Sequence, residues 1–291
     1  MCYIVTDTHG GWGGGVMEAR SAHVNDWAAI EALNQRARRT MPRLWGWEEH
    51  LTHDSFVVTE HDGIVSGALF AWSEALQVAW VRVATLDDAL EVGKWLDLAL
   101  PPLLEALRRQ EVQTLAWMDY DGWAGPDLRV RGFSRFADVM TLVKLNRALP
   151  DVGDADARLR LASNADVSAV VAVERAAFTP HWWHNEATMR RRVATSSYFA
   201  VAAVADEIVA YAEGTLRLPT AHLNRIAVHP DHQGHGIGAL LLQDALRTFW
   251  RYGAEQVTLN TQTANFRSQH LYRRFGFEPT GDIATAWEMH L

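Results

Sequence analysis

A glycine-rich run at 233–238, Gln-Gly-His-Gly-Ile-Gly, constrains the fold of this chain more than any other segment. It follows an apolar stretch at 223–228 that predicts a strand, and it precedes a helical pattern at 239–252. Glycines let the backbone approach an anion without a Cβ in the way, and the first N–H groups of the helix point at that anion. The run therefore predicts a strand–loop–helix unit that binds a pyrophosphate group.

A dinucleotide site is the first interpretation of this unit, because Gly234, Gly236 and Ala239 fit the pattern G-x-G-x-x-A. The dinucleotide fold holds the ribose with an acidic residue at the end of the next strand. The next predicted strand, 256–261, reads Gln-Val-Thr-Leu-Asn-Thr and contains no carboxylate. The residues that follow this strand are also too few to form the rest of a doubly wound sheet. This context excludes the dinucleotide interpretation.

The second interpretation includes Gln233 in the motif, as Gln-x-x-Gly-x-Gly, and a later segment accompanies it. Residues 265–277 follow the pattern Asn-x(6)-Tyr-x(3)-Gly-Phe. Over residues 155–291 this combination resembles the GNAT superfamily of N-acetyltransferases. The resemblance implies acetyl-CoA as co-substrate and a transferred acetyl group. Separately from the resemblance, we expect no metal ion.

The resemblance also implies which residues hold the cofactor. In that family acetyl-CoA lies between two splayed parallel strands, and the backbone of the first strand bonds to its pantetheine arm. The tyrosine of the second motif, Tyr272 here, is the general acid toward the CoA thiolate, because a phenol donates a proton where phenylalanine cannot. The expected cofactor-binding residues are Ile226, Ala227, Val228, Gln233, Gly234, His235, Gly236, Ile237, Gly238, Asn265, Ser268 and Tyr272.

The general base has two candidates. His222 lies eleven residues before Gln233, where some members of the family place a glutamate, and an imidazole titrates in the useful pH range. Glu213, on the preceding predicted strand, is the other candidate. Asn260 stands where peptide N-terminal acetyltransferases of the family carry a glutamate, and an amide cannot accept a proton. Proton transfer through ordered water, with no single base, is the remaining alternative.

An internal repeat organises the chain as a whole. The predicted helix at 96–109 matches that at 237–252, and Gly132-Phe133 matches Gly276-Phe277, at an offset near 140–145 residues. We therefore expect an α/β protein with two tandem GNAT-like domains, each a central mixed β-sheet flanked by helices.

The two halves differ in chemistry. The first half carries Asp87, Asp88 and Glu91 where the second half carries its glycines, and like charges repel a diphosphate. The expected organisation is a disordered glycine-rich tail at 1–16, a degenerate domain at 17–148 and a catalytic domain at 149–291.

Composition narrows the functional classes. The chain has 48% apolar and 21% charged residues, typical of a globular protein, and no apolar run approaches the length of a membrane span. A net charge of -8 argues against nucleic acid as a partner. The single cysteine, Cys2, fits a reducing compartment, and the first residues lack a signal-peptide pattern, so we expect a cytoplasmic protein without a membrane partner.

The expected function is transfer of an acetyl group from acetyl-CoA to a primary amine, by direct attack in a ternary complex. The acceptor is a small molecule or a peptide, and Trp182 and Trp183 are candidates for its wall. The alternatives are a non-catalytic acyl-CoA sensor and a tandem acetyltransferase of the mycothiol-synthase type. A metal site at His229, His232 and His235 is disfavoured, because these residues lie in the phosphate loop and their side chains would diverge or meet the cofactor.

Overall fold

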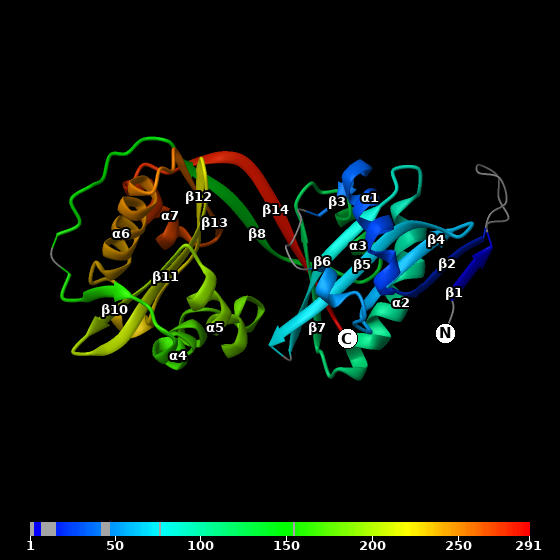
Figure 1. The fold of residues 1–291 in the computed structure, drawn as a ribbon, viewed down its shortest axis with the longest axis horizontal. Coiled ribbons are helices and arrows are strands. Elements are labelled where there is room, and N and C mark those ends of the chain that lie inside the picture. The colour runs from blue at the N-terminus through cyan, green and yellow to red at the C-terminus, as the bar shows by residue number, and fades with distance from the viewer. Residues whose placement is uncertain (1–2, 7–15, 42–46, 76, 154) are drawn as a thin grey trace. The chain divides into compact units, whose positions relative to one another are not determined.

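The computed structural model describes residues 3–6, 16–41, 47–75, 77–153 and 155–291. The chain divides into two compact units, each a mixed sheet with helices (Figure 1). Unit 1 comprises Met1–Phe136 and Ala284–Leu291, and unit 2 comprises Ala137–Ile283.

Unit 1 is built on a sheet with the strand order β1-β2-β4-β5-β6-β7-β14. Helices α1 and α2 pack against opposite faces, because neighbouring residues of β5 alternate between two cores: Leu69 faces α2, and Phe70 faces α1. The elements are β1 Tyr3–Thr6, β2 Val16–Ser21, η1 Val24–Asp26, α1 Trp27–Arg36, β3 Arg39–Thr40, η2 Trp47–His50, β4 Phe56–His61, β5 Ile64–Ala75, β6 Val78–Leu86, α2 Val92–Arg109, β7 Thr114–Asp119, α3 Gly125–Val130 and the end of β14 Glu278–His290.

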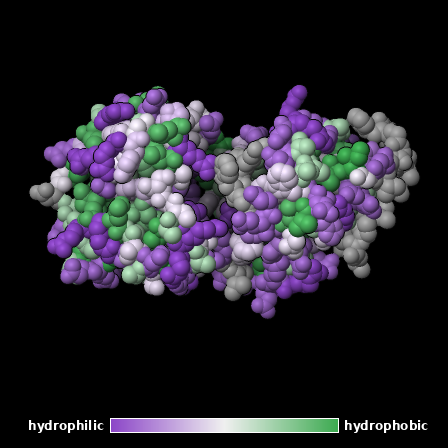
Figure 2. All heavy atoms as spheres, viewed as in Figure 1, coloured by the Kyte–Doolittle hydropathy of each residue, from purple (hydrophilic) through white to green (hydrophobic). Residues whose placement is uncertain are grey.

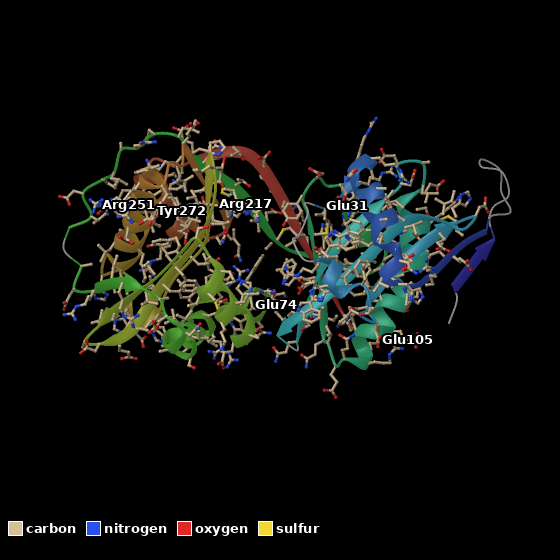
Figure 3. All side chains as sticks on the ribbon, viewed as in Figure 1. Glu31, Glu74, Glu105, Arg217, Arg251 and Tyr272 are labelled. Carbon is tan, nitrogen blue, oxygen red and sulfur yellow. The ribbon has the colours of Figure 1, made fainter. Side chains whose placement is uncertain are left out.

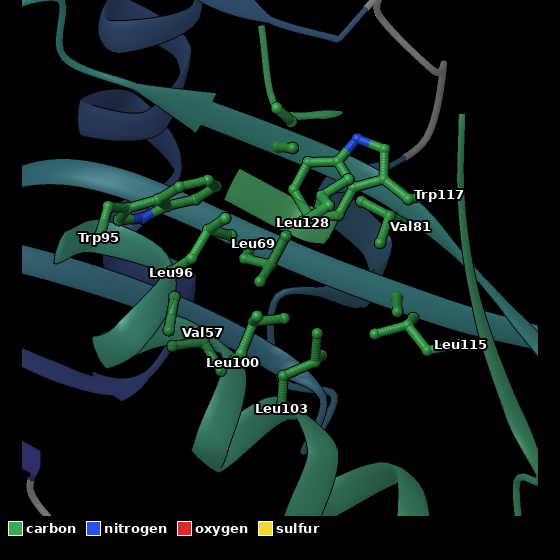
Figure 4. Close-up of a cluster of buried hydrophobic side chains, with 14 of the residues drawn as sticks. Val57, Leu69, Val81, Trp95, Leu96, Leu100, Leu103, Leu115, Trp117 and Leu128 are labelled. Atoms are coloured by element: carbon green, nitrogen blue, oxygen red, sulfur yellow. The ribbon is translucent and has the colours of Figure 1, made fainter. Parts of the chain in front are cut away.

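The larger core of unit 1 lies between α2 and the sheet (Figure 4). Leu96, Leu100 and Leu103 recur at the spacing of one helix face and are buried against Leu69 and Leu115 of the strands. Full burial of each such side chain contributes about 1.5–3 kcal/mol relative to exposure. This apolar stripe is what directs α2 onto the sheet.

Unit 2 repeats the same plan with the strand order β8-β13-β12-β11-β10-β9. Along β10, Tyr198 and Ala200 pack in the core beneath α6, whereas Phe199 and Val201 pack in the core beneath α4. The elements are β8 Ser134–Lys144, β9 Arg158–Leu161, η3 Asn164–Asp166, α4 Val167–Ala177, η4 Pro180–Trp182, α5 Glu186–Thr195, β10 Tyr198–Val204, β11 Glu207–Arg217, β12 Thr220–Val228, η5 Pro230–His232, α6 Ile237–Arg251, β13 Gln256–Gln262 and α7 Phe266–Arg274.

The internal repeat is visible in one ion pair. In unit 1 both Nη atoms of Arg20 donate to the carboxylate of Asp26 at 2.8 Å. In unit 2 Arg160 and Asp166 form the same two-pronged bond at 2.7 Å. In each case the aspartate also accepts the backbone N–H three residues before it, at the turn that leads into the first helix.

The units differ from the expected domain boundaries because two strands are exchanged. Residues 139–144 of β8 pair antiparallel with β13 of unit 2, although the repeat assigned them to the first half. Residues 285–290 of β14 pair antiparallel with β7 of unit 1, although they end the second half. Each sheet is therefore completed by a strand from the other half of the sequence, which no local pattern encodes.

The expected tail at 1–16 is also revised. Tyr3–Thr6 form β1, which pairs antiparallel with β2, so these residues extend the sheet of unit 1. The rest of the glycine-rich stretch, 7–15, and residues 1–2 lie outside the described residues.

The visible surface is mixed in character, with scattered apolar side chains between polar ones (Figure 2). Among the described residues, no helix combines the length and the apolar character that a bilayer crossing needs.

Candidate active site

An opening between two parallel strands is the central feature of unit 2. Strands β12 and β13 pair only from Thr220–Gln256 to Leu223–Leu259. Beyond these residues β12 continues to Val228 while remaining paired with β11 on its other side. The segment 224–228 therefore has one edge paired and one edge open toward β13, and a bulge at Asn224 marks where the strands separate.

The open edge carries specific backbone groups. His229 N–H donates to Val209 O at 2.8 Å, which fixes the phase of the antiparallel β11–β12 ladder. Because such a ladder alternates, the N–H and C=O groups of Ile226 and Val228 face away from β11, whereas those of Ala227 face it. Ile226 and Val228 are thus the residues whose main chain can bind a ligand in the opening.

The glycine loop follows β12 after the short turn η5. Gly234 and Gly236 adopt left-handed backbone conformations, with φ of +90° and +80°. Gly236 is the N-cap of α6, so the unpaired N–H groups of Ile237 and Gly238 lie at the mouth of the loop. A Cβ on Gly236 would meet only the Cβ of Ala155, at 3.6 Å, so the backbone conformation and not crowding requires glycine there.

Gln233 and Arg267 brace this loop. Gln233 Nε2 donates to Val228 O at 3.0 Å, and its Oε1 accepts from Arg267 Nη1 at 2.5 Å. Arg267 Nη2 lies 3.5 Å from the position that a Cβ on Gly234 would take. A guanidinium therefore borders the loop, where it can pair with a phosphate. The sequence analysis missed Arg267, although it stands two residues after Asn265 in the second motif.

The second motif forms α7. Asn265 caps this helix by accepting the Ser268 N–H at 3.1 Å. Tyr272 lies in the unit 2 core, with its ring edge-on to Phe277 at 5.9 Å, and is labelled in Figure 3. Burial raises the pKa of Tyr272 to about 12, and a hydrogen bond to Ser268 opposes that rise. The phenol is therefore protonated at neutral pH, as a proton donor must be.

His222 lies on the last paired stretch of β12 before the opening. Its Nδ1 is 2.7 Å from Thr258 Oγ1 on β13. Burial lowers the pKa of His222, and the nearby Glu213 carboxylate opposes that shift only in part. The imidazole is therefore neutral at pH 7, as a proton acceptor must be.

Glu213, the other candidate base, is held by three donors. Arg192 Nη1 and Ser196 Oγ each donate to its carboxylate at 2.7 Å, and Asn224 Nδ2 donates at 2.8 Å. Its carboxylate is buried, so taking up a proton would break an ion pair inside the protein. The geometry suits a role in holding the bulge at Asn224.

A second buried ion pair holds the loop before α5. Arg225 bonds to Glu174 of α4 through Nε at 3.0 Å and Nη2 at 2.8 Å, and Arg225 also donates to Trp182 O. Trp183 Nε1 donates to Phe178 O at 2.8 Å. Trp182 and Trp183 thus lie half-buried in a loop tied to β12. Sequence reasoning missed Arg225 and Glu174, because no local pattern links these two residues.

Asn260 accepts a hydrogen bond from Thr141 Oγ1 of β8 at 3.1 Å. His229, His232 and His235 border the glycine loop. In the described part of the chain, no three His, Cys, Asp or Glu side chains gather as metal ligands would.

The corresponding opening in unit 1 is filled. Strands β6 and β7 pair only from Val78 to Trp80, with the same parallel register as in unit 2. Farther along, β5 occupies one edge of β6 and β3 pairs with the other edge at Thr85 and Leu86. Met41 N–H adds a bond to Ala84 O at 2.9 Å. The chain itself occupies the edge that is open in unit 2.

The loop after β6 also differs from its counterpart. The carboxylate of Asp87 accepts the Ala89 N–H at 3.1 Å and a bond from Arg36 at 3.0 Å. Asp88 accepts the Arg38 N–H at 3.0 Å. Side-chain carboxylates thus bind the cationic and N–H groups that a phosphate would need.

Comparison with known proteins identifies the family of unit 2. Residues 168–277 match the model of the acetyltransferase (GNAT) family, a span that includes the glycine loop and Tyr272. Unit 2 is therefore a GNAT acetyltransferase domain. A curated Bacillus subtilis (strain 168) protein, named as a candidate ribosomal protein bS18-alanine N-acetyltransferase, is 22% identical over 116 residues, 40% of this chain and 77% of that protein.

Solved structures share the fold of most of the chain. A GCN5-related N-acetyltransferase from Sphaerobacter thermophilus has a TM-score of 0.66 at 17% identity, covering 94% of this chain and 95% of its own. A tandem GNAT protein from the clavulanic acid biosynthesis pathway has a TM-score of 0.65 at 17% identity, covering 94% and 98%. These similarities confirm the expected fold class, with GNAT-like folds in tandem.

Proposed function

We propose that unit 2 transfers the acetyl group of acetyl-CoA to a primary amine by direct attack in a ternary complex. One observation carries this proposal: the open edge of β12 leads, through the short turn η5, to the glycine loop. The pantetheine arm would bond to Ile226 and Val228 along that edge. The diphosphate would then meet the N–H groups at the start of α6 and the guanidinium of Arg267.

The side chains supply the proton transfers. The amine nitrogen attacks the thioester carbon, and the N–H proton passes to the neutral imidazole of His222. The C–S bond breaks, and the CoA sulfur takes the phenolic proton of Tyr272. The phenolate regains a proton and the imidazolium loses one, so the net products are the amide and CoA thiol. His222 serves as base better than Glu213, whose oxygens already accept three hydrogen bonds.

The acceptor is a small-molecule or peptide amine. The loop that carries Trp182 and Trp183 is tied to β12 by Arg225, which places it beside the strand that would hold the thioester. The curated Bacillus relative is named for acetylation of an alanine on a ribosomal protein, so a peptide α-amine is the first acceptor to test. We expect the reaction to take place in the cytosol.

Release of CoA thiol over a panel of amines tests the enzyme against a sensor. The panel should contain peptides with a free α-amine, blocked peptides that carry lysine, polyamines, aminoglycosides and amino acids. Turnover with any of them supports the enzyme. Tight acetyl-CoA binding without turnover across the panel would favour a non-catalytic acyl-CoA sensor, for which the missing carboxylate at Asn260 is the supporting observation.

Tyr272→Phe tests the acid. We expect kcat to fall by about 10²-fold, at the lower end of what general acid catalysis supplies, with the Kd of acetyl-CoA unchanged. Tyr252→Phe is the matched control, because Tyr252 is an exposed tyrosine at the end of α6. An unaltered rate in Tyr272→Phe would rule out the acid role.

A further inference from the structure

His222 belongs to a row of side chains that crosses three strands. Thr215 of β11 pairs with His222 of β12, and His222 pairs with Thr258 of β13. Because side chains of directly paired residues share one face of a sheet, both hydroxyls flank the imidazole. Thr215 Oγ1 accepts from Asn224 Nδ2 at 2.8 Å. The imidazole Nδ1 lies 2.7 Å from Thr258 Oγ1.

The Thr258 hydroxyl has only one proton to donate, and its direction decides the tautomer of His222. Thr258 Oγ1 lies 3.4 Å from Ala221 O, a carbonyl that can only accept. If the hydroxyl donates to that carbonyl, it must accept from His222, and the ring proton lies on Nδ1. Both contacts of Thr258 are satisfied together only in this arrangement.

The opposite ring nitrogen is then available. Among the residues that the structure describes, His222 Nε2 makes no hydrogen bond, and it is not one of the buried polar atoms that lack a partner. The His222 side chain is half-buried. In the Nδ1–H tautomer Nε2 carries the lone pair.

We propose that Thr258 is a positioning residue that holds His222 as the Nδ1–H tautomer, so that Nε2 receives the proton of the attacking amine. This inference rests on the proposed acetyl transfer. When Nε2 takes the proton, the imidazolium keeps its Nδ1–H bond to Thr258, and Nε2 later returns the proton to solvent. The charged groups around this face include Glu213, which favours the imidazolium, Arg192, which pairs with Glu213, and the Arg225–Glu174 ion pair.

Three variants separate positioning from structure. Thr258→Val removes the hydroxyl and keeps the shape, and Thr258→Ser keeps the hydroxyl. Thr220→Val is the matched control, because Thr220 accepts from Gln256 Nε2 at 2.8 Å between the same two strands but does not touch His222. The ¹⁵N spectrum of the histidine rings reads the tautomer, with the His222 signals assigned by their loss in His222→Gln.

We expect the Nδ1–H signature for His222 in the wild type, in Thr258→Ser and in Thr220→Val, and its loss in Thr258→Val. We also expect kcat of Thr258→Val to fall by about tenfold or more, within the range that a general base supplies, while Thr258→Ser keeps most of it. An Nε2–H signature in the wild type, or a Thr258→Val rate equal to that of the wild type, would overturn the proposal.

The acetyl transfer and the Thr258–His222 arrangement can be disproved separately. The ring spectrum needs no acceptor, so it tests the Thr258–His222 arrangement even if no amine is acetylated. Absence of turnover across the amine panel would overturn both the acetyl transfer and the base role of His222. A wild-type Nε2–H signature in a protein that does turn over would overturn only the present inference.

Discussion

Single residues around the opening divide into two groups by the number of partners they have. Glu174 and Glu213 are buried carboxylates, and each is matched by an arginine on a neighbouring element. Removing one partner from such a buried pair typically costs about 3–5 kcal/mol, so these residues define the geometry of the site. His222 instead keeps one nitrogen without a partner among the described residues, and that group is suited to proton transfer.

The pH dependence of kcat/KM follows from the shift of His222. Burial lowers the pKa of His222 below the ordinary 6.5, and the imidazole acts as a base only when it is neutral. As pH increases, kcat/KM should therefore rise through this lowered pKa, and above it His222 should cause no further change. A further rise near pH 8 would report deprotonation of a peptide α-amine. The check is a kcat/KM profile from pH 5 to 9. If His222→Gln retained the same acid limb, another group would be the base.

At the scale of elements, β12 is distinctive because its two edges are paired over different lengths. One edge is bonded to β11 along its length, and the other is bonded to β13 only as far as Leu223. The bulge at Asn224 lets the strand leave β13 without leaving β11. The left-handed glycines then turn the chain so that α6 starts at the end of the open edge.

The Gly236→Ala variant tests the link between this turn and cofactor binding. A left-handed alanine costs about 1–2 kcal/mol, and this strain falls on the residue that caps α6 and positions its first N–H groups. We expect the Kd of acetyl-CoA to rise at least about tenfold, measured by calorimetry.

Gly281→Ala is the control for that variant. Gly281 of β14 has φ of +96° and open space around its Cβ position, so the variant carries the same backbone strain away from the loop. Equal weakening of acetyl-CoA binding in both variants would show that strain alone, and not the loop, is responsible.

At the scale of the whole molecule, the chain contains two versions of one fold that differ at one strand edge and in the loop that follows it. In unit 2 the edge of β12 after the bulge is open, and in unit 1 the matching edge of β6 is paired with β3. The loop of unit 1 is further occupied by Asp87 and Asp88. Backbone donors that already have partners do not bind pantetheine.

We therefore expect one acetyl-CoA per chain. Isothermal titration should give a single site, and in Gly236→Ala no component should retain the wild-type affinity. A second site, or a tight component that survives the Gly236→Ala change, would show that unit 1 also binds the cofactor.

The sequence by itself determined the features that depend on neighbouring residues. Glycine at 234 and 236 predicted a phosphate-binding loop before a helix, and Asn265 with Tyr272 completed a recognisable spacing. The structure shows both glycines in left-handed conformations. The matching halves predicted a repeated fold, which the comparisons confirm. Backbone conformation and helix capping are local, so they can be read from adjacent positions.

Only the tertiary structure decided which partners these residues meet. The exchange of β8 and β14, the filling of the unit 1 opening by β3 and the three donors on Glu213 join residues far apart in sequence. Arg267 and Thr258 likewise gained their roles from Gln233 and His222, on other elements. The free energy of such pairings depends on burial and on competition between strands. Neither can be read from the order of amino acids alone.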